Sequence, residues 1–180
     1  MKIKYELVKN AAGRMVPTEV NGKAQIPYQG VHGYKPEGRK AAPPISSCSD
    51  YPMDGNKIVG SIKEALKKAG LKPGMTISSH HHFRNGDLVM NQVFDAAAEL
   101  GARDLMWFPS AAFPCHEPLT KYLENGVIHH IEGSLNGPLG KYASEGKMNG
   151  LAVLRSHGGR WQAIQDGEVL IDIAIIAAPT

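Results

Sequence analysis

Residues 74–87 read GMTISSHHHFRNGD, and the fold predicted for the rest of the chain is built outward from them. Their first part, 75–79, is short and contains β-branched residues, which is typical of a buried strand. Leu88 to Leu100 follows with helical spacing, and Gly101 suits the position after a helix. Asp87 stands where an N-cap belongs, because its carboxylate can accept from free backbone N–H groups. Open α/β folds bind ligands at the carboxyl edge of their sheet, so the polar loop between strand and helix is a candidate binding site.

The alternation of strand and helix continues along the chain. Further strands are predicted at 104–108, 127–131, 151–155 and 170–177, and helices at 61–69, 118–125, 138–145 and 158–165. Strands that alternate with helices imply a mainly parallel sheet with helices on both faces. The predicted fold class is therefore α/β, with three layers in the order αβα.

Residues 1–57 differ from the rest, because glycine and proline recur and no helical period survives them. We expect an extended N-terminal arm over 1–57 and an α/β domain over 58–180. The last predicted strand is strongly apolar and would need cover from a following element. The sequence is therefore expected to be the first part of a longer chain.

Composition excludes several classes of protein. The 180 residues carry a net charge of +3 from scattered basic residues, so nucleic-acid binding is not expected. Cys48 and Cys115 lie far apart, form no C-x-x-C pair and are expected to be ordinary thiols in a reducing compartment. No apolar run reaches the roughly 18–20 residues that span a bilayer, and the start lacks a signal-peptide pattern. We expect a cytoplasmic protein.

The histidine run at 80–82 has two open interpretations. In an extended segment His80 and His82 share a face while His81 does not. No carboxylate or cysteine stands at a familiar ligand spacing, so a metal site is not expected. The histidines could hydrogen-bond the backbone of a structural loop. Alternatively, their N–H groups could bind an anion together with Arg84 and the free N–H groups of the following helix.

The segment 155–160, RSHGGR, also follows a predicted strand and opens a helix. Its glycines fit a tight turn, whereas two arginines and a histidine at that place favour an anion. Ser110 and Asn136 follow two other predicted strands and should share the same edge. The sequence contains no G-x-S-x-G, Walker A or G-x-G-x-x-G pattern, so a nucleotide cofactor has no support.

Four stretches resemble the citrate lyase alpha subunit family, in the same order. They are PEGRKAAP at 36–43, residues 74–87, RSHGGR at 155–160 and IDIA at 171–174. The resemblance implies the α/β fold of the coenzyme A transferase-like superfamily, and the N-terminal part of a longer chain whose second half is absent here. It implies a citrate:acyl-carrier-protein transferase, which exchanges acetate for citrate on a carrier-protein thioester. No cofactor would be bound directly, because the thiol belongs to the CoA-like prosthetic group of the acyl carrier protein.

The resemblance also assigns roles to residues and partners. A tricarboxylate needs cations and donors, and the expected substrate-binding residues are His80, His82, Arg84, Ser110, Asn136, Arg155, His157, Gly158, Gly159 and Arg160. Backbone N–H groups at Asn85 and Gly86 are the expected catalytic donors to a developing oxyanion. The expected partners are the beta (lyase) subunit and the gamma acyl carrier protein, in an oligomer. Family sites form between two halves, so this chain is expected to be inactive alone.

Two other functions stay open at this point. The same fold could serve as a non-catalytic module that binds a small acid or a sugar phosphate. A sugar-phosphate isomerase would need a carboxylate base beside the anion loop, and Asp87 is better used as a helix cap. The sequence does not decide between citrate and a relative such as citramalate.

Overall fold

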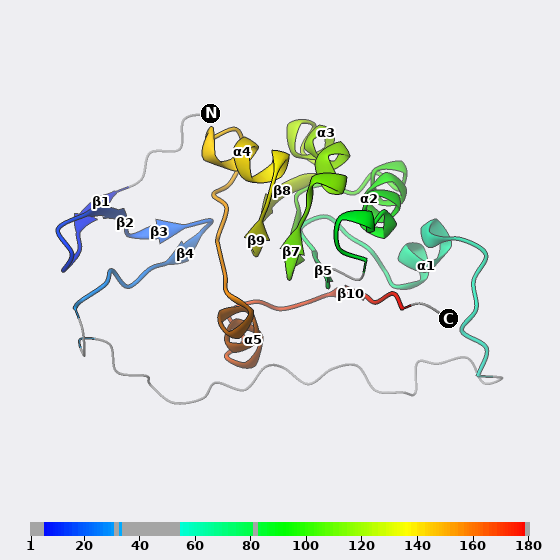
Figure 1. Cartoon of the computed structure of the whole chain (residues 1–180). Coiled ribbons are helices and arrows are strands. Elements are labelled where there is room, and N and C mark those ends of the chain that lie inside the picture. Colours follow the sequence, from blue (N-terminus) through cyan, green and yellow to red (C-terminus); the bar gives the residue numbers. More distant parts are fainter. Residues whose placement is uncertain (1–5, 31–32, 34–54, 81–82, 179–180) are drawn as a thin grey trace. The chain divides into compact units, whose positions relative to one another are not determined.

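The computed structural model describes residues 6–30, 33, 55–80 and 83–178. The chain divides into two compact units, Met1–Arg39 and Lys40–Thr180 (Figure 1). The resembling stretch at 36–43, together with Cys48, His81 and His82, lies outside the described residues. The division expected after residue 57 stays a prediction.

The first unit contains two short antiparallel hairpins. β1 (Leu7–Lys9) pairs with β2 (Met15–Pro17), and β3 (Glu19–Val20) pairs with β4 (Lys23–Ala24). Asn21 and Gly22 join the second pair, with φ values of 49° and 75°. Two-residue hairpins favour turns with positive φ at both positions, and Asn-Gly is the sequence that adopts them most readily. Within residues 6–30 the structure contains no helix, in line with the glycine and proline content.

The second unit is built on a parallel sheet with the strand order β10-β5-β6-β8. These strands are β5 (Thr76–Ser79), β6 (Leu105–Pro109), β8 (Ile128–Ile131) and β10 (Ile173–Ile175). Two short strands, β7 (Ala111–Ala112) and β9 (Ser134–Leu135), pair in parallel just after β6 and β8. β5 and β6 are buried along their whole length, as strands covered on both faces should be.

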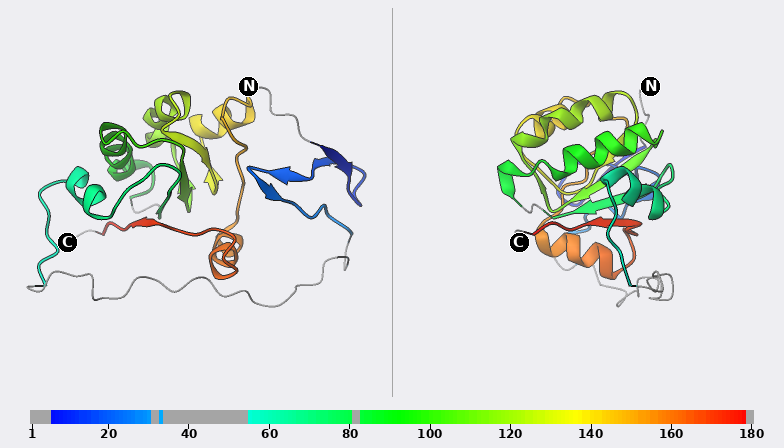
Figure 2. Two further views of the ribbon diagram at one scale, coloured as in Figure 1. Left: turned by 180° about the vertical axis from the view of Figure 1, so that it is seen from behind. Right: turned by 90° about the vertical axis from the view of Figure 1, so that its right-hand side faces the viewer.

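Helices cover the two faces of this sheet unequally. α1 (Ile62–Lys68), α2 (Val89–Glu99), α3 (Thr120–Glu124) and α4 (Pro138–Ser144) lie on one face, and α5 (His157–Gln165) lies on the other (Figure 2). Two 3₁₀ segments, η2 (Arg84–Gly86) and η3 (Pro114–Leu119), precede α2 and α3.

The core has two parts that meet at β6. Leu105 and Trp107 belong to the larger cluster on the four-helix face, whereas Met106 and Phe108 pack with Ala163 and Val169 on the α5 side. Successive side chains of a strand point to opposite faces, so one strand supplies both layers. The predicted three-layer α/β fold with a parallel sheet is confirmed.

Two predicted strands are wrong in extent. Residues 151–155 form only a single bridge, between Val153 and Glu132, and Leu154 is exposed. The strand predicted over 170–177 shortens to Ile173–Ile175, at the edge of the sheet, where it pairs on one side only within the described residues. The apolar runs at 151–155 and 170–177, which predicted long buried strands, are therefore only partly buried by the rest of the unit.

Helix starts also differ from the predicted ones in places. The helix expected at Pro118 begins as the 3₁₀ segment η3 at Pro114 and becomes α-helical only at Thr120. Pro118 cannot donate a backbone N–H to an α-helical ladder, so an irregular first part is expected there. Asp87 lies one residue before the observed N-cap of α2, Leu88, and its Oδ1 accepts from the Val89 N–H at 3.1 Å. The capping contact therefore exists, displaced by one position.

Candidate functional site

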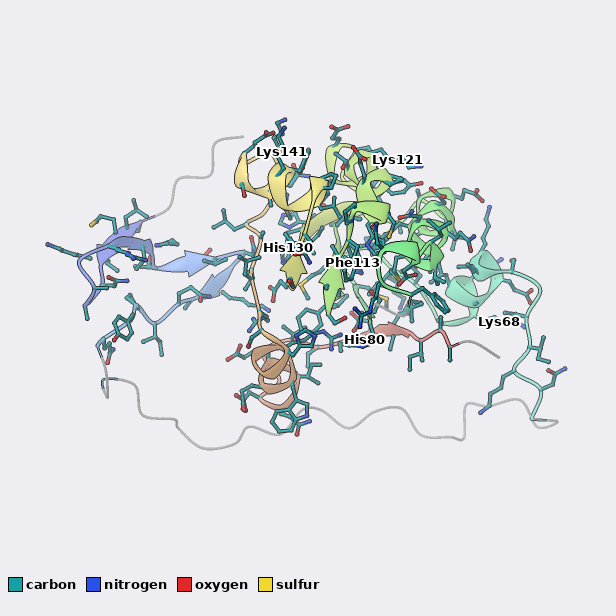
Figure 3. All side chains as sticks on the ribbon, in the orientation of Figure 1. Lys68, His80, Phe113, Lys121, His130 and Lys141 are labelled. Atoms are coloured by element: carbon teal, nitrogen blue, oxygen red, sulfur yellow. The ribbon has the colours of Figure 1, made fainter. Side chains whose placement is uncertain are left out.

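The carboxyl edge, where β5, β6 and β8 end, gathers the loops that the sequence singled out. The Ser110 N–H donates to the Ser79 carbonyl at 2.9 Å, so the residue after β6 lies beside the end of β5. Asn136 follows β9, and its Nδ2 donates to the Ala112 carbonyl at 3.1 Å. Figure 3 marks this edge with His80, which follows β5, and Phe113, which follows β7. His80 is exposed and Ser110 is buried.

Arg160 reaches this edge from α5. Its Nη2 donates to the Ser78 hydroxyl at 2.6 Å and to the Phe108 carbonyl at 3.2 Å, near the ends of β5 and β6. The guanidinium carbon lies 4.6 Å from the centroid of the Phe108 ring. Cation–π contact and two neutral acceptors therefore hold the side chain in place.

The charge of Arg160 is not neutralised by the protein parts that the structure describes. No carboxylate of residues 6–30, 33, 55–80 or 83–178 forms an ion pair with it, and its buried Nε has no hydrogen-bond partner there. Burial lowers the pKa of Arg160, although a guanidinium stays charged in proteins. A half-buried cation without a carboxylate is an arrangement that an anionic ligand would complete.

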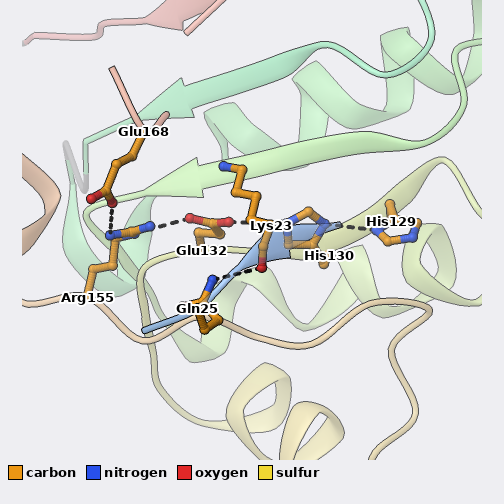
Figure 4. Close-up of polar contacts among 7 residues, drawn as sticks. All are labelled: Lys23, Gln25, His129, His130, Glu132, Arg155 and Glu168. Carbon is orange, nitrogen blue, oxygen red and sulfur yellow. Dashed lines mark hydrogen bonds and ion pairs between the residues drawn. The ribbon is translucent and has the colours of Figure 1, made fainter. Parts of the chain in front are cut away.

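Arg155 is arranged in the opposite way. Its Nε donates to the Glu132 carboxylate at 3.1 Å, and its Nη1 donates to Glu168 at 3.4 Å (Figure 4). Glu132 is only 2 % exposed and also lies 3.4 Å from the Nε2 of His130. The argument that both arginines need an external anion therefore does not hold for Arg155. Its role in substrate binding stays a prediction.

The glycines of the 155–160 segment lie inside α5. Ser156 is the N-cap of the helix, and its hydroxyl accepts from the Gly159 N–H at 3.0 Å. A Cβ at position 159 would lie 3.2 Å from that hydroxyl, so the close approach explains a glycine there. A Cβ at Gly158 would meet nothing within 4 Å, and His157 is exposed. The serine cap and Gly159 thus set how the helix that carries Arg160 begins.

The turn at residues 84–87 is held by η3. The Cys115 N–H donates to the Asn85 Oδ1 at 2.9 Å, and the Cys115 carbonyl accepts from the Asn91 Nδ2 at 2.9 Å. The Cys115 thiol lies 3.4 Å from the Asp87 carbonyl oxygen and 3.6 Å from that of Arg84. Arg84 itself is exposed and has a φ of 53°.

One of the two backbone donors expected in this turn, the Gly86 N–H, is already used. The Gly86 N–H donates to the Phe83 carbonyl at 3.0 Å, and the Asp87 N–H donates to the Arg84 carbonyl at 3.2 Å. These bonds close the 3₁₀ turn, so a ligand would compete with them. A role of Asn85 and Gly86 as catalytic donors stays a prediction.

His116 is a buried titratable residue beside the turn. Its Nδ1 accepts from the Phe113 N–H at 3.0 Å, which leaves the proton on Nε2. The ring packs edge-on against Trp107, with 5.2 Å between the ring centroids. Burial lowers the pKa of His116 below its ordinary value of 6.5, against the opposing effect of the nearby Asp87. The residue is therefore held neutral.

Four residues of this edge were not assigned a role from the sequence: Ser78, Asn91, Cys115 and Glu132. Only Glu132 left a usable signal, because it is a carboxylate directly after a predicted strand. Within the described residues, no group of three or more His, Cys, Asp or Glu side chains could hold a metal ion. None of the described helices has the length and apolarity needed to span a membrane.

The fold and this edge define an α/β protein with a half-buried arginine at the carboxyl ends of its parallel strands. Residues 55–180 match the family described as "Citrate lyase, alpha subunit (CitF)", and the chain belongs to that family.

The chain is similar to the citrate lyase alpha chain of Klebsiella pneumoniae, at 46 % identity over 124 residues, which is 68 % of this chain and 24 % of the relative. It is 39 % identical to that of Haemophilus influenzae, over 78 % of this chain and 28 % of the relative. A crystal structure described as the alpha subunit of citrate lyase from Streptococcus mutans, in complex with citrate, matches with a TM-score of 0.68 and 39 % identity. That match covers 82 % of this chain and 28 % of the other. The chain thus spans about a quarter of the length of its relatives.

Proposed function

We propose that this chain is the citrate-binding first part of a citrate:acyl-carrier-protein transferase. Membership of the citrate lyase alpha subunit family supports this, as does a related structure described as a complex with citrate. The observation that carries the proposal is Arg160, a half-buried cation at the carboxyl edge without a carboxylate partner in the described residues.

In the proposed reaction a citrate carboxylate replaces acetate on a carrier-protein thioester. The acetyl–sulfur bond breaks, a citryl–sulfur bond forms, and one carboxylate oxygen of citrate leaves with acetate. Arg160 would bind a carboxylate that does not react, and exposed Arg84 would contribute a second cation at the same edge. Binding at a remote carboxylate orients the reacting one, which is how a positioning group lowers the barrier.

The proposed partners follow from the family. They are a beta subunit that cleaves the citryl thioester, and a gamma acyl carrier protein whose CoA-like prosthetic group carries the thiol. We propose that the assembly works in the cytoplasm, and that catalysis needs the remaining part of the family's chain. No residue observed here favours the alternative of a non-catalytic binding module.

Calorimetry with citrate tests the site. Arg160→Gln should weaken citrate binding about 10- to 100-fold, because one charge-assisted hydrogen bond contributes about 1.5–3 kcal/mol. Arg103→Gln is the matched control, since Arg103 precedes β6 at the opposite edge and donates to the Asn125 carbonyl. Equal citrate affinity in the parent and Arg160→Gln would exclude this arginine from the site.

Acetate release distinguishes the transferase from a binding module. The chain is mixed with acetyl-carrier protein, citrate and the remaining part of the family's chain. Release that depends on citrate supports the transferase, whereas citrate binding without release supports the module.

A further inference from the structure

The Oδ1 and Nδ2 atoms of the Asn85 side chain lie in different surroundings. Oδ1 accepts the Cys115 N–H at 2.9 Å, and because a backbone N–H can only donate, this bond identifies the oxygen arm. The NH₂ group is therefore the other arm. Asn85 is exposed, and no acceptor in the described residues takes a hydrogen bond from its Nδ2.

Cys115 is fixed in a way that orients its N–H. Its carbonyl accepts from the Asn91 Nδ2 on α2, so the peptide groups on both sides of the residue are bonded to the 84–91 segment. Burial raises the pKa of the Cys115 thiol, which keeps its proton available for the Asp87 and Arg84 carbonyls. Every polar group of Cys115 thus contacts the segment that contains Asn85.

Two backbone donors of the turn are already occupied. The N–H groups of Gly86 and Asp87 bond to carbonyls within the turn. Beside the exposed Arg84 guanidinium, the Asn85 side chain is therefore a donor of this turn that can reach a ligand without breaking a backbone bond.

We infer that Asn85 is a ligand-facing hydrogen-bond donor at the carboxyl edge, and that Cys115 and Asn91 are positioning residues that keep its NH₂ group outward. The inference rests on the proposed function, because the acceptor is taken to be a carboxylate oxygen of citrate. Side-chain amides are well suited to this task, since the donor is neutral and has a fixed direction.

Asn85→Asp is the variant that separates donation from folding. It keeps an oxygen that can accept from Cys115, but it replaces the NH₂ group by a second oxygen and adds negative charge. Asn125→Asp is the matched control: the Asn125 Oδ1 also accepts a backbone N–H, from Val127 at 3.1 Å, and it lies before β8 at the opposite edge. By calorimetry we expect Asn85→Asp to weaken citrate binding at least tenfold, and Asn125→Asp to change it less than twofold.

A second measurement tests the positioning without any ligand. Amide hydrogen exchange at Cys115, followed by NMR, should be as slow in Asn85→Asp as in the parent, because the acceptor oxygen remains. Asn85→Ala removes that acceptor, and exchange at Cys115 should become about tenfold faster at an unchanged melting temperature. Equal exchange in all three proteins would refute the positioning role.

The outcomes separate this inference from the proposed function. If the parent binds citrate and Arg160→Gln weakens it while Asn85→Asp does not, the donor role of Asn85 is wrong and the function stands. If the parent does not bind citrate, the proposed function fails and the donor role fails with it. Slow Cys115 exchange in Asn85→Asp, together with loss of citrate binding in that variant but not in Asn125→Asp, supports the inference in full.

Discussion

His116 makes stability depend on pH at the scale of a single residue. Burial lowers its pKa in the folded state below the ordinary 6.5. The unfolded chain therefore binds more protons, and stability is complete above pH 6.5 and falls as the pH drops towards the folded-state pKa. His129, whose pKa burial and His130 also lower, contributes in the same direction.

The prediction is that the melting temperature falls from pH 7.5 to pH 5.5, and that His116→Asn makes this fall smaller. Asparagine offers an oxygen to the Phe113 N–H but does not titrate. It loses the ring contact with Trp107, so stability should drop by about 1 kcal/mol at pH 7.5. His157→Asn, at an exposed position, is the control. A pH dependence identical in His116→Asn and the parent would contradict the argument.

The sequence identifies candidate residues of the site, but it does not predict which residues they contact. Residues 80–87 and Arg160 were singled out because they follow predicted strands, and the structure places His80, residues 83–87 and Arg160 at the same edge. The pairing of Arg155 with Glu132 and Glu168 could not be foreseen, since it depends on a chain direction that no local pattern encodes. The same holds for the hydrogen bond that the Asn91 Nδ2 donates to the Cys115 carbonyl.

At the scale of elements, the Glu132–Arg155 pair joins the end of β8 to the segment before α5. Glu132 is buried and Arg155 is mostly so, whereas Glu168 is more than half exposed. Glu132→Gln would leave Arg155 without its buried partner, and we expect a loss of about 3 kcal/mol of unfolding free energy in urea. Glu168→Gln should cost less than about 1 kcal/mol, because exposed pairs contribute little. Similar losses in the two variants would refute the assignment.

Elements with strong local signals were predicted within one or two residues, including α2, α4, β6 and β8. The failure at 151–155 has a physical cause. The run is apolar, but only Val153 pairs with the sheet, and Arg155 turns away to Glu132. Strand propensity alone does not supply a partner strand, and burial on the pleated surface decides the outcome.

At the scale of the whole second unit, β10 leaves the sheet with an edge strand and apolar neighbours. Ile176 is 84 % exposed and Leu170 is 52 % exposed. Edges of this kind invite pairing with another chain. We therefore expect this chain to self-associate in light scattering, and Ile176→Lys to reduce the associated fraction at least twofold.

The matched control for that change is Ile58→Lys. Ile58 is about as exposed as Ile176, at 87 % against 84 %, but it lies before α1 and is not adjacent to β10 in the sequence. It should leave association unchanged. A parent chain that is monomeric at all concentrations would show that the β10 edge does not drive self-association.

The fold class followed from the sequence, whereas the strand order did not. Alternating strands and helices predict a parallel sheet, and short right-handed crossovers explain why β5, β6 and β8 lie in chain order. The position of β10 beside β5 is determined by contacts between residues that are far apart in the sequence. It depends on contacts such as the bond from the Thr76 N–H to Asp172 Oδ2 at 2.7 Å, and local periodicity carries no information on these.

The pairing of β5 with β10 also sets the timing of assembly on the ribosome. Thr76 and Asp172 are separated by 96 positions, so β5 is made long before its outer neighbour. At about 5–20 residues per second, translation of the intervening chain takes roughly 5–20 s. During that interval one side of β5 has no native partner strand, although β6 can already pair with the other. The nascent chain therefore spends seconds with an open hydrogen-bonding edge, and this is the period in which a chaperone would protect it most.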